Sequence, residues 1–259
     1  MKVNQIPRVD VANRYQTFTD LQAEGAIQSL KLKLGDHQAH YLKAGRGPTV
    51  VLLHGFASDS QDWLGTIAAL SHCCCLYAPD LIGCGPGGRN NRGYYLSDFV
   101  EFTQDFIRTL GIGCQVLVGH SLGGRVCLEI ALRYPERIRR LVLVDTLGFS
   151  RLARWGSFLI KAAWAVRKVL RHPQPYPRLL KEDSEDKDWL CLEELPALKV
   201  PTLIVWSRHD PYFPLSGALR ARELIPEARL EILAGYGHAP HMQQRDIFNS
   251  LLLSFTGHA

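Results

Sequence analysis

The stretch that decides the fold is V-L-V-G-H-S-L-G-G, residues 116–124. Val116 to Val118 form an apolar run with no polar position, which is typical of a strand buried on both faces. From Leu122 onward the apolar residues follow the spacing of a helix. Ser121 therefore lies on a sharp turn between a strand and a helix, and residues 119–123 match the pattern G-x-S-x-G. The hydroxyl on such a turn projects from the sheet edge, although a glycine turn with a capping serine also fits the bare pattern.

The regions on either side of this turn alternate between strand and helix patterns. Further apolar runs lie at residues 49–53, 73–78, 115–118, 140–144 and 202–206, with a weaker run at 229–233. Helical patterns fill residues 97–110 and 122–134. Two runs at 26–34 and 37–44 predict an antiparallel hairpin. The alternation predicts an α/β chain with a mainly parallel sheet covered by helices on both faces.

Residues 147–195 interrupt this alternation, because they contain no convincing strand. Apolar residues between Leu152 and Leu170 recur at spacings of three and four, which predicts an amphipathic helix. We expect an insertion that lies over the carboxyl ends of the strands, where ligands bind in such sheets. The predicted organisation is a core formed by residues 1–146 and 196–259, with a helical insertion formed by residues 147–195.

Length and composition exclude several classes of protein. The chain has 259 residues, 46% hydrophobic and 21% charged, which excludes a disordered, collagen-like or coiled-coil chain. The 30 basic and 25 acidic residues give a net charge of +5, too mild to indicate a nucleic-acid partner. No apolar run is long enough to span a membrane, and the first residues lack a signal segment. The seven cysteines lack zinc-ligand spacing, so we expect reduced thiols and a cytoplasmic location.

A serine hydroxyl becomes a nucleophile only when a base removes its proton and an acid orients that base. His238 is the best placed of the ten histidines, since its loop follows the last predicted strand, and His241 on the same loop is the second choice. Asp210 and Asp145 each follow a predicted strand. Hydrolases with this turn have the chain order serine, acid, histidine, which favours Ser121, Asp210 and His238. The backbone amides of Leu122 and Phe56 are the expected donors to the oxyanion.

These motifs resemble the α/β-hydrolase family over most of the chain, from about Gly45 to Phe255. The resemblance rests on the loop at residues 54–56, the turn at 119–124, Asp210 and the pair Gly237–His238. It implies a mostly parallel eight-stranded sheet with a small helical cap inserted after the sixth strand, and a serine-hydrolase triad. It implies no cofactor and no metal. Family members that dehalogenate or open epoxides use an aspartate where this chain has Ser121, so these activities are not expected.

The leading expectation is a carboxylesterase- or lipase-like enzyme that acts on a small hydrophobic or acyl ester. The residues expected to line its substrate site are His54, Gly55, His120, Arg125, Trp155 and Leu159.

Three alternatives remain open. Arg125 after the double glycine resembles the menaquinone-pathway synthase that eliminates pyruvate, although that group usually carries tyrosine in place of His120. Carbon–carbon bond hydrolases of meta-cleavage pathways are similar too, but they usually carry asparagine there. A ligand receptor without catalytic activity is the third alternative.

The predicted insertion has a strong local charge. Residues 147–181 contain eight basic residues and no acidic one, and an acidic cluster follows at residues 182–188. A solvated helix face with nearby acidic partners explains this pattern simply. A basic helix that carries aromatic residues also fits a peripheral contact with an anionic membrane.

Overall fold

The computed structural model describes residues 27–85, 93–113, 116–169, 176–177 and 190–257. Its centre is an eight-stranded sheet with the order β1-β2-β4-β3-β6-β7-β9-β10. The strands are β1 (Ile27–Leu34), β2 (His37–Ala44), β3 (Thr49–Leu53), β4 (Cys75–Pro79), β6 (Val116–His120), β7 (Arg140–Val144), β9 (Thr202–His209) and β10 (Arg229–Tyr236). β2 pairs antiparallel with β1 and β4, and the other neighbours pair parallel. The predicted mostly parallel sheet of eight strands is confirmed.

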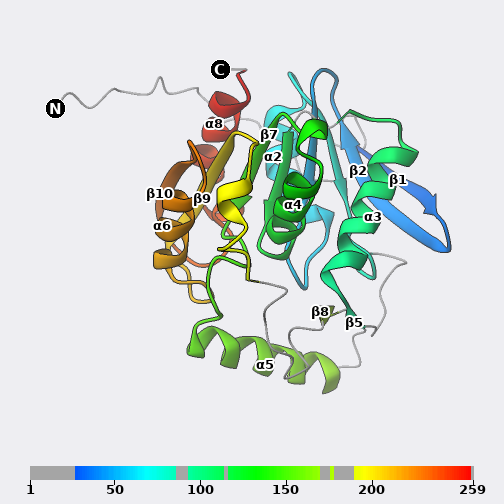
Figure 1. Cartoon of the computed structure of the whole chain (residues 1–259). Helices are drawn as coiled ribbons and strands as arrows, with labels where there is room; N and C mark the ends of the chain where they lie inside the picture. Colours follow the sequence, from blue (N-terminus) through cyan, green and yellow to red (C-terminus); the bar gives the residue numbers. More distant parts are fainter. Residues whose placement is uncertain (1–26, 86–92, 114–115, 170–175, 178–189, 258–259) are drawn as a thin grey trace.

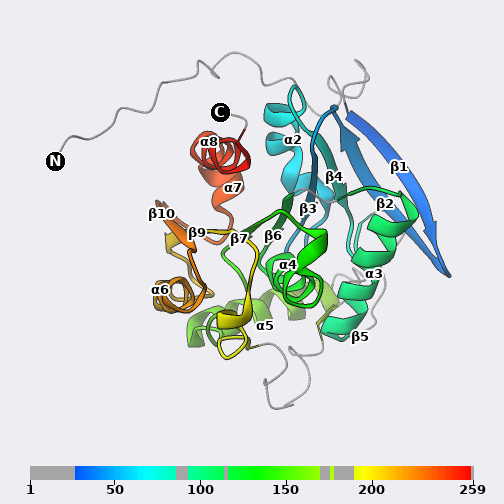
Figure 2. The same ribbon diagram turned by 45° about the horizontal axis from the view of Figure 1, so that its top comes forward.

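Helices cover both faces of the sheet (Figures 1 and 2). One face carries α3 (Leu96–Thr109), α4 (Leu122–Arg133) and α6 (Leu215–Leu224); the other carries α2 (Leu64–Leu70) and α8 (Arg245–Thr256). Successive residues of a strand point to opposite faces. In β3, Val51 and Leu53 accordingly join the first layer, and Val50 and Leu52 join the second. All four are fully buried, which explains why the strand is apolar from Val50 to Leu53.

Shorter elements connect these layers. They are η1 (Ser60–Trp63), η2 (Pro135–Arg137), η5 (Leu195–Ala197), α7 (Pro240–Gln243), and the pair β5 (Gly93–Tyr94) and β8 (Tyr176–Pro177). The amides of Cys73 and Cys74 both donate to the Leu70 carbonyl oxygen, so the predicted strand at 73–78 begins only at Cys75. β9 extends three residues beyond its predicted end because Ser207 and His209 still pair with β10.

The predicted insertion contains α5 (Arg154–Val169) between β7 and β9. Figure 1 shows α5 beyond the edge of the sheet, apart from both layers of helices. Residues 170–175 and 178–189 lie outside the described part of the chain, so the boundaries 147–195 stay a prediction. Among the described residues, no helix combines the length and the apolar character that crossing a membrane requires. In this part of the chain, Cys73, Cys74, Cys75 and Cys191 are free thiols.

Candidate active site

Ser121 lies on the turn between β6 and α4 with φ 52° and ψ −113°, a strained conformation for a residue with a side chain. Its amide donates to Val144 O over 2.9 Å, and its carbonyl oxygen accepts from the amide of Leu147. The turn is tight because a Cβ atom at Gly119 would lie 2.3 Å from the carbonyl oxygen of Gly123. The glycines thus let the chain fold back on itself, and neighbouring strand ends fix the serine.

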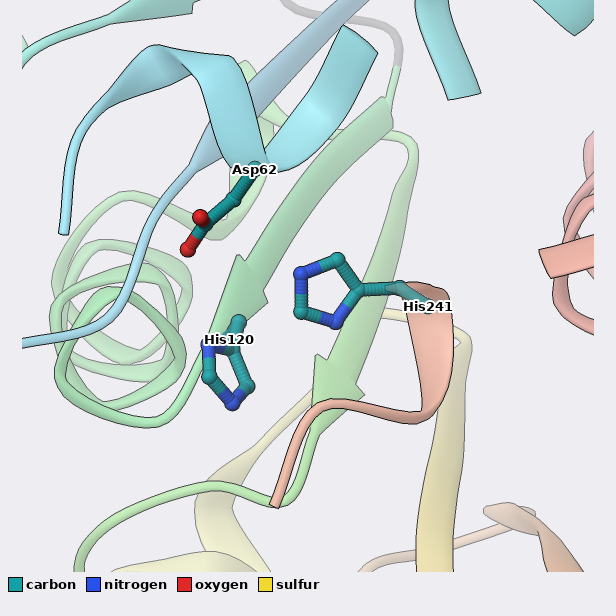
Figure 3. Close-up of side chains that lie close together, drawn as sticks. All are labelled: Asp62, His120 and His241. Atoms are coloured by element: carbon teal, nitrogen blue, oxygen red, sulfur yellow. The ribbon is translucent and has the colours of Figure 1, made fainter. Parts of the chain in front are cut away.

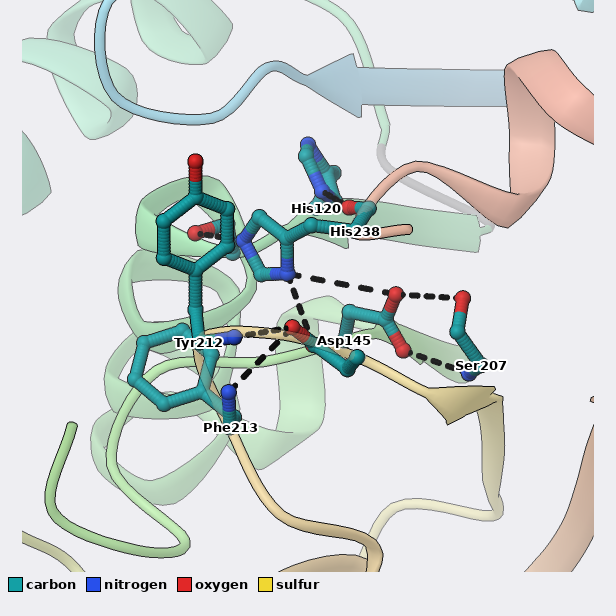
Figure 4. Close-up of polar contacts among 8 residues, drawn as sticks. His120, Asp145, Ser207, Tyr212, Phe213 and His238 are labelled. Atoms are coloured by element: carbon teal, nitrogen blue, oxygen red, sulfur yellow. Dashed lines mark hydrogen bonds and ion pairs between the residues drawn. The ribbon is translucent and has the colours of Figure 1, made fainter. Parts of the chain in front are cut away.

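The structure brings Ser121, His238 and Asp210 into one hydrogen-bonded series. His238 Nε2 lies 2.8 Å from Ser121 Oγ, and His238 Nδ1 lies 2.7 Å from Asp210 Oδ2. A carboxylate can only accept, so Nδ1 carries the proton and Nε2 is left to accept from the serine hydroxyl. The other oxygen of Asp210 accepts from the amides of Tyr212 and Phe213, at 2.7 and 3.2 Å. These hydrogen bonds hold the acid in place while it orients the histidine. Figure 4 labels Tyr212, Phe213 and His238, the three residues that bond to it.

Asp145, the rival acid, lies behind the same imidazole but is farther away. Its Oδ2 is 3.9 Å from His238 Nδ1, and its two oxygens accept from the amide and hydroxyl of Ser207 at 2.7 and 2.8 Å. Its side chain is fully buried. Burial, helped by the negative charge of Asp210, raises the pKa of Asp145 to about 7. The geometry therefore favours Asp210 as the partner of His238.

The loop after β3 passes directly against the serine turn. A Cβ atom at Gly55 would lie 3.2 Å from Ser121 Cβ, so glycine is required for this approach. Phe56 follows it, and Leu122 begins α4 immediately after the serine. The roles of these two amides as oxyanion donors stay predictions.

The expectation that His54 lines the substrate site is wrong. Its ring is fully buried, with Nδ1 donating to the Gly55 carbonyl oxygen and Nε2 accepting from the amide of Leu81. Both nitrogens are thus used to fix the loop.

His120 is likewise turned toward protein. Its Nε2 donates to the carbonyl oxygen of His238, and its ring lies between those of His238 and His241, with centroids 4.8 and 4.6 Å away. Burial, together with the nearby charges of His241 and His238, lowers the pKa of His120 well below its usual range. The expected substrate contact is replaced by support of the His238 loop.

His241, the second-choice base, is also buried, and its ring packs tilted against that of Trp63 with the centroids 4.3 Å apart. Burial lowers its pKa to about 3.

Two groups of three side chains offer ligand atoms that all lie within 4.8 Å of one another. One consists of Asp62, His120 and His241 (Figure 3), and the other of Asp145, Asp210 and His238. In the described residues these two groups are the ones that could hold a metal ion.

Arg125 does not face the site as expected. Its guanidinium is almost fully buried, 2.6 Å from Glu129 Oε2 and 3.8 Å from Glu194 Oε2. A carboxylate of the substrate would have to displace these acidic partners. The expected role in substrate binding is therefore wrong.

The two α5 residues expected at the site are only partly described. Trp155 lies in the helix, but its side chain is outside the described part, and Leu159 is half-buried. The start of α5 does approach the site, because a Cβ atom at Gly156 would lie 2.7 Å from Pro211 O.

Sequence reasoning missed Ser207, Tyr212 and Phe213. The rings of Tyr212 and Phe213 lie 4.9 and 5.3 Å from the His238 ring. Tyr212 and Phe213 could have been predicted to lie near the site, because they follow Asp210 by two and three residues. The contact of Ser207 with Asp145 depends on the pairing of β7 with β9, which the sequence does not state.

Comparisons with known proteins agree with this architecture. The model of the alpha/beta hydrolase family matches residues 50–251. The chain is 29% identical to a pimeloyl-[acyl-carrier protein] methyl ester esterase of Nitrosomonas europaea, over 82% of this chain and 96% of that protein.

Two solved structures are similar over most of their length. Carboxylesterase CesB of Bacillus subtilis has a TM-score of 0.72 and 25% identity, over 88% of this chain and 91% of that one. The meta-cleavage product hydrolase CumD of Pseudomonas fluorescens has a TM-score of 0.69 and 26% identity, over 88% and 97%. The similar proteins thus include two that are named as esterases and one that is named as a meta-cleavage product hydrolase.

Proposed function

The chain belongs to the alpha/beta hydrolase family, and from that premise we propose that it hydrolyses carboxylic esters at Ser121. The observation that carries the proposal is the series Ser121 Oγ, His238, Asp210, with separations of 2.8 and 2.7 Å. These are the distances at which a base can take a hydroxyl proton while an acid holds its tautomer.

The reaction proceeds in two halves. His238 Nε2 takes the proton of Ser121 as Oγ attacks the ester carbonyl carbon, and the amides of Phe56 and Leu122 stabilise the oxyanion. The intermediate collapses, the bond to the leaving alkoxide breaks, and His238 returns the proton to give the alcohol and an acyl-serine. Water then attacks the acyl group with His238 as base, which releases the carboxylic acid and restores Ser121. Asp210 stabilises the imidazolium in both halves without taking its proton.

Cleavage of a carbon–carbon bond is the second candidate, and the similarity to CumD favours it. The same serine, histidine and acid serve both reactions, so the substrate decides between them. The pyruvate-eliminating alternative has less support, because Arg125 is engaged by Glu129 and Glu194. A receptor without catalytic activity would not need a serine hydroxyl that is hydrogen-bonded to a histidine.

A substrate panel tests the proposal. We expect hydrolysis of p-nitrophenyl esters from acetyl to long acyl, and no cleavage of a vinylogous diketone. Ser121→Ala should lower ester turnover by roughly 10⁶-fold, as loss of a triad member does. Ser250→Ala, on the outer side of α8, is the matched control and should keep the parent rate. Cleavage of the diketone without ester hydrolysis would replace the ester proposal with the carbon–carbon one.

A further inference from the structure

Most of the exposed α5 side chains that the structure describes are apolar. These exposed residues recur at spacings of three and four and so form one face of the helix. This outer face of α5 consists of Phe158, Lys161, Ala162, Ala165, Val166 and Val169. Val166 and Val169 are 57% and 81% exposed. Among the exposed α5 side chains that the structure describes, Lys161 is the one that carries a charge. A surface helix of a globular protein normally shows charged and polar residues to water, so this face is the reverse of the usual arrangement.

The start of α5 lies beside the candidate active site. The amide of Ala153, just before α5, donates to Tyr212 O over 2.8 Å, and the ring of Tyr212 contacts the His238 ring. Beyond the other end of α5, β8 pairs with β5 near the start of α3. The helix therefore lies across the edge of the sheet with contacts on both sides (Figure 1). A surface that binds the outer face would therefore meet the molecule on the side of the strand ends at which Ser121 lies.

The charge of this region indicates which surface fits. Arg151 and Lys161 are both exposed, and residues 147–181 carry eight basic residues without an acidic one. The exposed cations Arg151 and Lys161 attract anionic headgroups. An apolar helix face with basic neighbours is the composition that rests in the interface of a bilayer.

We propose that the outer face of α5 binds the surface of an anionic lipid membrane, and that the active site takes acyl esters from that membrane. Apolar side chains enter the boundary between headgroups and acyl chains, and Lys161 and Arg151 contact the headgroups. The binding surface stands on its own observations, whereas the substrate class rests on the proposed esterase function.

Vesicle co-sedimentation tests the surface. We expect the protein to bind vesicles of phosphatidylcholine mixed with phosphatidylglycerol more strongly than phosphatidylcholine alone. Replacing both valines, Val166→Glu with Val169→Glu, should lower the partition coefficient at least about tenfold, because two apolar side chains leave the interface. Leu219→Glu is the matched control, since Leu219 is 46% exposed on α6, and it should bind as the parent does.

Hydrolysis separates this proposal from the proposed function. The double valine variant should cleave a short water-soluble ester at the parent rate, which shows that it is folded, but cleave a long-chain ester in anionic vesicles several-fold more slowly. Ser121→Ala should bind vesicles normally and cleave neither ester. Vesicle binding without any ester hydrolysis would refute the esterase and the substrate class but leave the membrane surface intact.

Three results would overturn the membrane surface. The first is a parent protein that binds neither kind of vesicle, and the second is a double variant that binds as strongly as the parent. The third is a dimer in solution that the double variant splits, since the outer face would then be a protein interface.

Discussion

At the level of single residues, two aspartates flank His238, and the structure gives them different roles. Asp210 accepts a hydrogen bond from His238 Nδ1 over 2.7 Å, while Asp145 is 3.9 Å away and accepts hydrogen bonds from Ser207. We predict that Asp210→Asn lowers kcat for a soluble ester by about 10³- to 10⁴-fold, because an amide can stabilise the wrong tautomer of the imidazole. Steady-state kinetics on a p-nitrophenyl ester measures this. If Asp210→Asn retained the parent kcat, Asp210 would not be the orienting acid.

Asp145 should instead affect stability, with a defined dependence on pH. Its pKa of about 7 lies above its ordinary value of 3.8, so the folded protein resists ionising it. Below pH 4 the carboxyl group is protonated in both the folded and the unfolded chain, and its contribution to the free energy of unfolding is fully present. As the pH rises to 7, the unfolded chain releases this proton first, so the free energy of unfolding falls by up to about 4 kcal/mol. We predict that the Tm of Asp145→Asn, relative to the parent, rises by several degrees between pH 5 and pH 8.

Calorimetry across this pH range measures the difference. Asp36→Asn, in the exposed turn between β1 and β2, is the control for loss of a carboxyl group at the surface. A Tm difference for Asp145→Asn that stays constant or falls between pH 5 and pH 8 would contradict the prediction.

From the sequence we could predict which residues follow a strand and so lie near the site. We could not predict the direction in which their side chains point. Asp210 and His238 could be predicted because loops after parallel strands meet at one edge of the sheet. His54, His120 and Arg125 lie near the same edge, yet their rings and guanidinium turn into the protein. Packing between distant segments decides that direction, and the sequence around each residue does not contain it.

At the level of elements, the strand–turn–helix at residues 116–133 depends on its glycines. A Cβ atom at Gly119 would lie 2.3 Å from a backbone oxygen, which cannot move without shifting the serine. We predict that Gly119→Ala lowers the free energy of unfolding by about 2–4 kcal/mol and removes most of the activity. Denaturant unfolding and ester hydrolysis measure both effects.

Gly113→Ala is the matched control, because a Cβ atom there meets nothing within 4 Å and its φ is not positive. This variant should keep the parent stability within about 0.5 kcal/mol. Equal stability of the two variants would mean that the turn is not tightly packed.

Most strands and helices could be predicted because their apolar residues keep a clear period. The ends were less accurate where hydrogen bonds from a neighbour decide them. Cys73 and Cys74 bond to the end of α2 and not to the sheet, and β9 continues through Ser207 because β10 pairs with it. These partners are distant in the sequence, so local patterns could not reveal them.

At the scale of the whole molecule, the fold class followed from the alternation of buried strands and helices. The pattern did not predict the order of the strands in the sheet. β4 follows β3 in the sequence but lies between β2 and β3 in the sheet, so the chain turns back from β3 through a crossover to reach this place. The insertion was visible as a break in the alternation, but the apolar outer face of α5 was not. The sequence shows a period in this helix, and only the fold shows which side of it faces water.

The central claim is that Ser121 is an activated nucleophile, and labelling with a fluorophosphonate tests it most directly. The reagent reacts with a serine whose hydroxyl a neighbouring base has activated. Intact-mass spectrometry should show one adduct per chain, peptide mapping should place it on Ser121, and Ser121→Ala should remain unlabelled. A parent protein that stays unlabelled, or an adduct on another residue that persists in Ser121→Ala, would contradict the account.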